Sequence, residues 1–411
     1  MNYRVYNPKK DRKACLRIWQ ECSWIDSSKE EAAAFDILVE GCRALVADLN
    51  GEAECLVLSI PGVIRYLDEE LALSVVTNVT TSRIARKQGL AKRLTAQSIA
   101  ADVAAGAQVS VLGIFEQGFY NRLGFGSGGY EHRISFDPAQ LNINVKARVP
   151  RRLDRKKDGA SVHAAMLARK RGHGACSLNS DAFIRAEMHW LRDGFGLGYF
   201  DGPNGELTHL IWCGTKGEGG SYSVLLCIYQ NREQFLELMA LVKSWGDQVR
   251  MVRMHEPPDI QMQDLIEQPF RYRLLTRKSE FENSNLATAY WQMRICDLPG
   301  CLAKTHLRAD TVRFNLKLRD PIEKYLPDDV PWRGVSGDYV VTLGPSSGAE
   351  PGTDATLPTL TAALGAFTRM WIGVRPATGL AVTDDLVGPP DLLDALDRVL
   401  CLPDPNVDWD F

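Results

Sequence analysis

The sequence has few of the features that mark secreted, membrane-spanning or disulfide-linked proteins. Its ten cysteines are scattered and form no Cys-x-x-Cys pair, which favours reduced, mostly buried thiols. The first twenty residues, MNYRVYNPKKDRKACLRIWQ, lack the apolar core of a signal peptide. No apolar run approaches the length that a bilayer crossing needs. We therefore expect a cytoplasmic protein without a membrane span.

A strong excess of charge of either sign is also absent. The chain has 48 basic and 51 acidic residues and a net charge of −3, so the molecule as a whole is not an electrostatic nucleic-acid binder. Cys296, Cys301 and His306 resemble a set of metal ligands, but no fourth ligand accompanies them. We expect neither a metal nor a nucleic-acid partner.

The length of the chain, 411 residues, indicates more than one domain. Two polar stretches, KARVPRRLDRKKDG (146–159) and RKSEFENSN (277–285), suit connections between domains. They divide the chain into three segments of ordinary domain size, which we expect to be domains over residues 1–148, 149–285 and 286–411.

Each segment mixes the two hydrophobic periods, so the prediction is an α/β (α+β) fold. In the second segment, Asn231 is placed to cap a helix, with Gln234 at the reciprocal position. The predicted strands are 71–81, 108–115, 222–230, 310–320 and 337–344, and the predicted helices begin after Gly89, at 231 and at 391.

The junction between the strand 71–81 and the following helix carries the sequence ARKQGLA (85–91). The first N–H groups of a helix have no internal partner, and the helix dipole adds positive charge there, so such an end binds phosphate. Gly89 gives access, and Arg86 and Lys87 add charge. A solvated basic turn is the alternative. The second strand–helix junction, YQNREQF (229–235), has no glycine, so only the first segment is expected to hold such a site.

Two motifs in this order resemble those of the GCN5-related N-acetyltransferases (GNAT). Residues Arg86–Ala91 match the family's R/Q-x-x-G-x-G/A signature, and FYNRLGFG (119–126) is similar to the motif that closes its acetyl-CoA site. The whole chain resembles the Eis (enhanced intracellular survival) family. That resemblance implies two tandem GNAT-type mixed-sheet domains, the second degenerate, followed by a sterol-carrier-protein-2-like domain.

Other stretches carry the same resemblance. They are GACSLNSDAFIRAEMHW (174–190), YWQMRICDLPGCLA (290–303) and the final DWDF. The resemblance also implies a homo-oligomer, a hexamer, although no assembly signal is visible in the sequence.

The resemblance assigns roles to particular residues. Tyr120 is the expected general acid, with Tyr130 as the alternative if the motif is out of register. A phenol with a pKa of about 10 can protonate a departing thiolate whose conjugate acid has a pKa of about 8.5. The terminal carboxylate of Phe411 is the expected base. Backbone amides at Asn78 and Val79 hold the pantetheine arm. The pyrophosphate is bound by the loop residues Arg86, Lys87, Gln88, Gly89, Leu90 and Ala91.

The end of the chain is acidic. From Thr383 to Phe411 there are eight aspartates against a single arginine. An acidic tail delivered to an active site concentrates cations there, which favours amines of aminoglycosides, polyamines or lysine as acceptors. Asp26, Glu30 and Glu31 are further candidates for the same cleft. A different class of function stays open, in which the third domain binds a lipid or small ligand and the acetyltransferase is vestigial.

Overall fold

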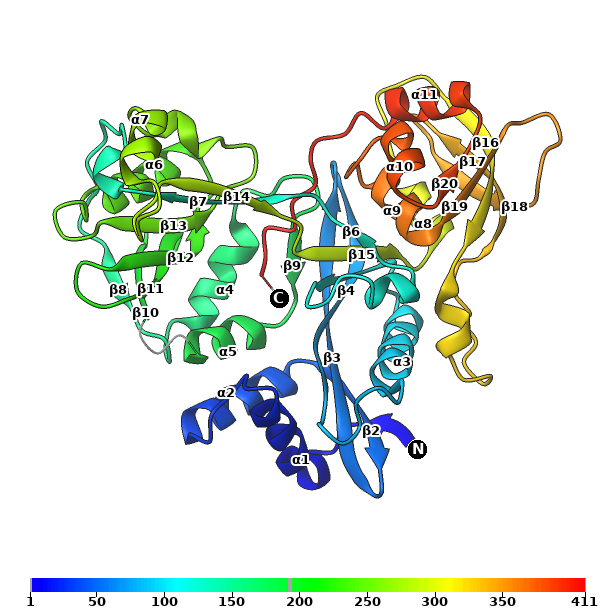
Figure 1. Cartoon of the computed structure of the whole chain (residues 1–411), viewed down its shortest axis with the longest axis horizontal. Helices are drawn as coiled ribbons and strands as arrows, with labels where there is room; N and C mark the ends of the chain where they lie inside the picture. Colours follow the sequence, from blue (N-terminus) through cyan, green and yellow to red (C-terminus); the bar gives the residue numbers. More distant parts are fainter. Residues whose placement is uncertain (1, 191–193, 411) are drawn as a thin grey trace.

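The computed structural model describes residues 2–190 and 194–410. Their strands form three mixed sheets, and the three sheets lie in three lobes of the molecule (Figure 1). One hydrophobic cluster connects the lobes, because it contains Trp19, Trp212 and Trp371, one from each. Within the described residues, no helix combines the length and the apolar character that a membrane crossing requires.

The first sheet is built mostly from the start of the chain. Its strands, in spatial order, are β1 (Asn2–Val5), β2 (Arg43–Leu49), β3 (Glu52–Tyr66), β4 (Glu69–Thr81), β5 (Val109–Gly113), β15 (Trp291–Ile295) and β6 (Gly126–Ser127), with β9 (Cys176–Leu178) paired to β3. Along this order the neighbours are antiparallel except β4 and β5, which are parallel because helix α3 (Leu90–Ala104) connects them. Helices α1 (Pro8–Glu21) and α2 (Lys29–Glu40) lie between β1 and β2 in the chain.

The second sheet repeats this arrangement. Its order is β8 (Arg151–Leu153), β10 (Gly194–Tyr199), β11 (His209–Thr215), β12 (Ser221–Ile228), β13 (Met251–His255), β7 (Glu131–Phe136) and β14 (Ser284–Thr288). The fourth and fifth strands, β12 and β13, are again parallel and are connected by helix α6 (Arg232–Lys243). The second segment is therefore a topological copy of the first.

Each of these two sheets contains a strand from another segment. In both, that strand takes the sixth place: β15, from the third segment, lies between β5 and β6, and β7, from the first segment, lies between β13 and β14. The division at residues 148 and 285 does not anticipate this arrangement, because β7 precedes the first boundary and β15 follows the second.

The two polar stretches that we expected to be linkers are partly strands. Strand β8 lies within residues 146–159, and β14 begins within residues 277–285. Both are the outermost strands of the second sheet. The role of these stretches as linkers stays a prediction, but parts of them are strand, because polar and charged residues are also common in edge strands.

The third sheet has the order β18 (Gly348–Pro351), β17 (Gly337–Leu343), β16 (Val312–Arg319), β19 (Thr359–Ala363) and β20 (Leu386–Val387). Its helices are α8 (Leu298–Ala303), α9 (Leu364–Trp371), α10 (Ala377–Thr383) and α11 (Pro390–Val399). The remaining helices of the described residues are α4 (Gly159–Ala168), α5 (Ala182–Trp190), α7 (Pro269–Thr276) and the short 3-10 turns Tyr120–Leu123, Pro138–Gln140, Met262–Leu265 and Pro321–Tyr325.

The elements predicted from local patterns are present. Asn231 caps α6 by accepting a hydrogen bond from the N–H of Gln234 at 3.0 Å, and the Gln234 side chain accepts one from the N–H of Gln230 at 2.8 Å. Helix α3 begins at Leu90 directly after Gly89, as the junction predicts. Its two buried faces follow from its position between the first sheet and the turn Pro321–Tyr325.

Candidate active site

The loop between β4 and α3 leaves a helix end open. Gly89 has a φ of +78°, a left-handed conformation that favours glycine, and a Cβ added there would meet nothing within 4 Å. Arg86 and Lys87 are exposed beside it. Among residues 2–190 and 194–410, no acceptor bonds the N–H groups of Leu90 or Ala91. The loop therefore offers unpaired donors and nearby positive charge to an anion.

Strand β4 is bulged where the pantetheine arm is expected. The pairing with β3 shifts between Leu56, opposite Thr80, and Leu58, opposite Thr77, so two residues face one. The two bulged residues are Asn78, whose φ is +51°, and Val79. On the other side, β4 pairs with β5 only as far as Val76. The backbone around Asn78 and Val79 is thus out of the regular ladder on both sides.

Tyr120 begins a short 3-10 turn and is 7% exposed. Its ring packs edge-on against Phe119, with centroids 4.8 Å apart, and against Phe125 at 6.1 Å. It belongs to the same hydrophobic cluster as Leu90 of α3. Burial, with a smaller effect of the Cys55 thiol, raises the pKa of Tyr120 to about 12, so its hydroxyl stays protonated and can donate at neutral pH.

The alternative tyrosine lies in a different environment. Tyr130 is 60% exposed, and the Arg375 guanidinium lies 5.2 Å from its ring centroid. Tyr130 is therefore a surface residue, whereas Tyr120 is buried in the same hydrophobic cluster as Leu90.

The acidic tail is held in place by Arg169. This guanidinium, 5% exposed, forms an ion pair with Asp408 at 2.6 Å and donates to the Asp408 carbonyl at 3.0 Å. It also donates to the carbonyl of Cys176 at 2.7 Å, and the Cys176 N–H donates to the Val407 carbonyl at 2.9 Å. The Trp409 ring packs near Arg169 and is buried. The described end of the tail is therefore a docked segment.

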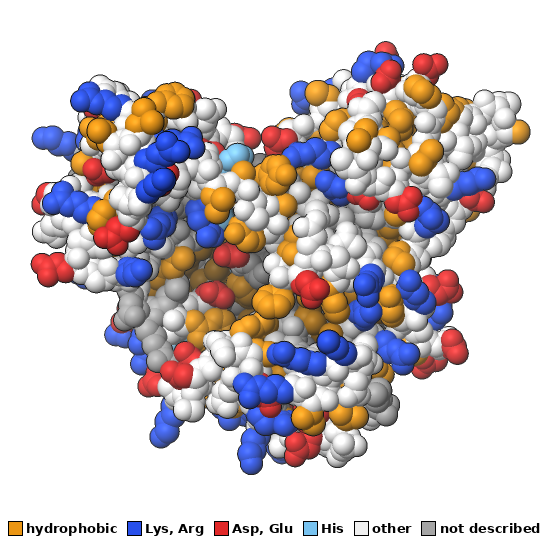
Figure 2. All heavy atoms as spheres, viewed as in Figure 1, with side chains coloured by type: hydrophobic (Ala, Val, Ile, Leu, Met, Phe, Trp, Pro, Cys, Tyr) orange, Lys and Arg blue, Asp and Glu red, His pale blue; other side chains and the backbone are white. Residues whose placement is uncertain are grey.

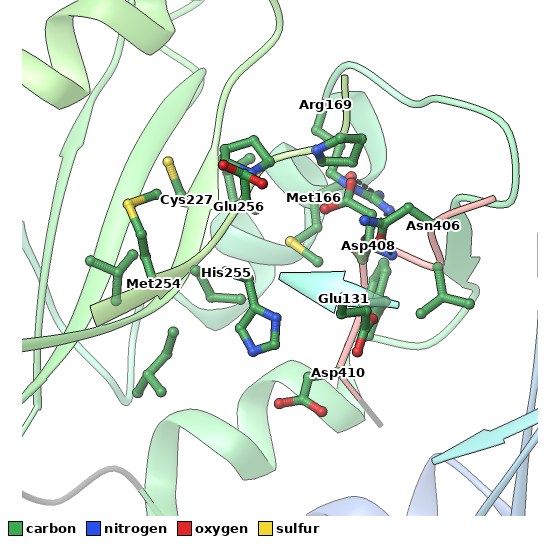
Figure 3. Close-up of a pocket in the computed structure, with 18 of the residues that line it drawn as sticks. Glu131, Met166, Arg169, Cys227, Met254, His255, Glu256, Asn406, Asp408 and Asp410 are labelled. Carbon is green, nitrogen blue, oxygen red and sulfur yellow. Dashed lines mark hydrogen bonds and ion pairs between the residues drawn. The ribbon is translucent and has the colours of Figure 1, made fainter. Parts of the chain in front are cut away.

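The tail forms one wall of a cavity of about 320 Å³. The other walls come from α4, α5, the ends of β12 and β13, and the start of β15 (Figure 3). Figure 2 shows a hollow between the lobes where acidic and hydrophobic side chains gather. Six carboxyl side chains line the cavity, namely Glu131, Glu187, Glu256, Asp259, Asp408 and Asp410.

Three of these carboxyl groups have shifted pKa values. Burial, together with the Asp410 charge, raises the pKa of Glu131 to about 7 and that of Glu187 to about 7. Burial also raises the pKa of Asp408, which the ion pair with Arg169 opposes. The cavity therefore holds carboxyl groups whose charge changes near neutral pH and which a bound cation would stabilise in the ionised form.

Most of the site residues predicted from the sequence lie outside the cavity. Asn78, Val79, Arg86, Lys87, Gln88, Gly89, Leu90, Ala91 and Tyr120 lie along the β4–α3 side of the first sheet, and none of them lines the cavity. Gly113, the last residue of β5, lines the cavity and borders the gap between β4 and β5. Phe411 lies outside the described residues. Asp26, Glu30 and Glu31, the further candidates for this cleft, do not line the cavity.

Sequence reasoning missed Glu131, Glu187 and Arg169. Glu187 lies within residues 174–190, which carry part of the family resemblance, but nothing in the sequence places it near the tail. A carboxylate on a helix is normally exposed to water, so the sequence pattern gave no reason to expect Glu187 in a cavity. Only the meeting of α5, β7 and the tail turns these residues toward one cavity.

A further polar cluster lies in the second lobe. Ligand atoms of Asp201, His209 and Glu237 lie within 4.8 Å of one another. The Arg148 guanidinium donates to Asp201 at 2.6 Å and to Glu237 at 2.7 and 2.8 Å. These hydrogen bonds hold the pKa of Glu237 down at about 2, so arginine already supplies the positive charge that the carboxylates need.

Comparison with known proteins identifies the first domain. Residues 2–128 match the model of the acetyltransferase (GNAT) domain family. Three solved structures resemble the whole chain: a probable N-acyltransferase from Enterococcus faecalis V583 (14% identity, 100% of this chain and 99% of that one, TM-score 0.79), a GCN5-related N-acetyltransferase from Kribbella flavida (18%, 100% and 98%, 0.74) and Eis1 from Mycobacterium abscessus (14%, 100% and 100%, 0.75). No curated protein sequence matches the chain.

The expected α/β fold with tandem GNAT-type sheets is thereby confirmed. The chain begins with an acetyltransferase domain and is an acetyltransferase enzyme.

Proposed function

We propose that the protein transfers acetyl groups from acetyl-CoA to primary amines of a cationic acceptor. The acceptor is an aminoglycoside-like or polyamine-like small molecule or a lysine side chain. The observation that carries this proposal is the acidic cavity at the end of β5. The carboxyl-lined cavity attracts a cationic amine, and Gly113 borders both the cavity and the gap in which acetyl-CoA would lie.

In this proposal the first sheet binds acetyl-CoA through its backbone. The bulge at Asn78 and Val79 frees amides for the pantetheine arm and for the thioester carbonyl oxygen, on which negative charge develops. The pyrophosphate lies at the start of α3 against the N–H groups of Gln88 to Ala91, with Arg86 and Lys87 nearby.

The reaction is a direct attack. The neutral amine nitrogen adds to the thioester carbonyl, the C–S bond breaks, and Tyr120 gives its proton to the departing thiolate. The ammonium group must first lose a proton, and a second proton leaves the nitrogen as the amide forms. The resemblance assigns this base role to the carboxylate of Phe411, acting through water, and the docking of Asn406 to Asp410 supports that role.

The first experiment measures thiol release from acetyl-CoA with a panel of polyamines, aminoglycosides and lysine peptides. Amine-dependent release is expected, and deletion of Phe411 alone should reduce it strongly while acetyl-CoA binding persists. Absence of release with every amine would favour the lipid- or ligand-binding role, which the acetyltransferase domain match disfavours.

The helix end gives a prediction with a matched control. Gly89→Ala should raise the KM for acetyl-CoA about tenfold, because the new methyl group stands where a phosphate approaches the N–H groups. Gly106→Ala, beyond the other end of α3, also places alanine at a positive φ in open space. Both variants should lose similar stability, about 1–2 kcal/mol, but only Gly89→Ala should change the KM. Equal KM values for acetyl-CoA in the two variants would contradict the binding of a phosphate at the start of α3.

The cavity carboxyls predict a pH dependence of acceptor binding. Glu131 and Glu187, with pKa values of about 7, are mostly neutral at pH 6 and mostly charged at pH 8. Binding of a diamine without acetyl-CoA should therefore tighten about tenfold over this range, as a charge-assisted hydrogen bond is gained. Calorimetric titration of the protein and of the Glu131→Gln/Glu187→Gln double variant tests this. The same pH dependence in the double variant would exclude these carboxyls.

A further inference from the structure

The gap between the parallel strands of the second sheet is open. Strands β12 and β13 pair from Ser221 to Ser223 opposite Met251 to Arg253 and then diverge. The cavity begins at this point, because its lining includes β12 from Val224 onward and β13 from Met254 onward. The gap is topologically equivalent to the one between β4 and β5 in the first sheet.

This second gap is not built to hold a second acetyl-CoA. Where the first sheet has Gly89 and free N–H groups, the N–H of Gln234 is bonded to the Asn231 side chain and that of Gln230 to the Gln234 side chain. No glycine opens the junction, so the pyrophosphate has no equivalent site. The space is left for another ligand.

The part of the cavity inside this gap is mostly apolar. Its buried lining side chains are Met166, Ile184, Met188, Val224, Ile228 and Met254, each at most 6% exposed. Three are methionines, whose flexible thioethers adapt to the shape of an apolar ligand. In Figure 3, Met254 and Cys227 lie on one side of the cavity, with His255 and Glu256 beside them, and Glu131, Asp408 and Asp410 lie on the other. The cavity is therefore mostly apolar at one end and mostly acidic at the other.

This distribution discriminates among cationic acceptors. A polycation with charges along its whole length would place some of them against the apolar walls, where they would be desolvated without a partner. A molecule with one charged end and an apolar body meets both ends of the cavity. The volume of about 320 Å³ is about twice that of a cavity that holds benzene, which leaves room for a ring and a short chain.

On the basis of the proposed function, we propose that the acceptor is a primary amine on an apolar body, an arylalkylamine or a medium-chain alkylamine. Its ammonium group lies against Glu131 and Glu187 near the tail, and its body lies in the gap between β12 and β13. The second GNAT-type sheet thus contributes the acceptor pocket rather than a second cofactor site.

The test measures kcat/KM for acetylation of linear primary amines from methylamine to heptylamine and of 2-phenylethylamine, beside spermidine and an aminoglycoside. We expect kcat/KM to rise about three- to fourfold per added methylene until the gap is filled. Met254→Gln and Met166→Gln should flatten this rise. Met239→Gln, a buried methionine of α6 outside the cavity, is the matched control and should keep it.

The outcomes distinguish a failure of this inference from a failure of the proposed function. If no amine is acetylated, the proposed function fails. If spermidine and the aminoglycoside are acetylated and kcat/KM does not rise with chain length, the proposed function stands and this inference is overturned. A rise that persists unchanged in both cavity variants would also overturn it, because the apolar body would then bind elsewhere.

Discussion

Tyr120→Phe should lower kcat for acetyl transfer by about 10²- to 10⁴-fold, the usual contribution of a positioned general acid. The replacement removes one oxygen and keeps the ring, so the packing against Phe119 and Phe125 is preserved. Because the pKa of Tyr120 is raised to about 12, the hydroxyl holds its proton across the working range. Its loss should therefore appear in kcat and leave the KM for acetyl-CoA within about twofold.

Tyr130→Phe is the control for this experiment, since Tyr130 is the alternative in the sequence motif and is exposed. It should keep nearly full activity. Steady-state kinetics and thermal unfolding of both variants separate a catalytic loss from a folding defect. A small effect at Tyr120 combined with a large one at Tyr130 would show that the motif is out of register by the distance between them.

Asp320→Asn should lower the free energy of unfolding by about 3–5 kcal/mol, because it leaves the Arg294 charge buried without its partner. Both side chains are fully buried, and the Arg294 guanidinium lies 2.6 Å from the Asp320 carboxylate. The same carboxylate accepts the N–H groups of Ile322 at 3.1 Å and Val335 at 3.0 Å. The pair joins β15 of the first sheet to the third lobe.

Asp385→Asn is the matched control for stability. Its ion pair with Arg319 lies on the same lobe but is more than half exposed, so its loss should cost at most about 1 kcal/mol. Denaturant unfolding followed by fluorescence compares the two variants. Equal, small losses would mean that water reaches Arg294 in the variant. A double change to Arg294→Met and Asp320→Leu should recover much of the loss, because no lone charge stays buried.

This pair also connects the third lobe to the turn Tyr120–Leu123. Arg294 donates a hydrogen bond to the carbonyl of Leu123, the last residue of the turn that Tyr120 begins. The neighbouring β15 residue Gln292 donates to Asn121 at 3.1 Å. Deletion of the third segment would therefore remove a strand of the first sheet together with these contacts. The third segment is therefore part of the framework that holds the turn Tyr120–Leu123 in place.

The local parts of this protein could be predicted from the sequence by itself. The loop from Arg86 to Ala91, the helix that follows it and the cap at Asn231 depend on neighbouring residues, through backbone conformation and hydrogen bonds within one turn. Tyr120 could be named because its motif is contiguous. The acidic character of the tail could be predicted from its amino-acid composition.

The cavity and the positions of β7 and β15 in sheets of other segments were decided only by the tertiary structure. A short strand such as β15 carries no information about which sheet it will join, since backbone hydrogen bonds are the same in either one. The raised pKa values of Glu131 and Glu187 exist only once α5, β7 and the tail have excluded water around them. The burial of these side chains arises where segments distant in the sequence pack together, and no short stretch of sequence encodes it.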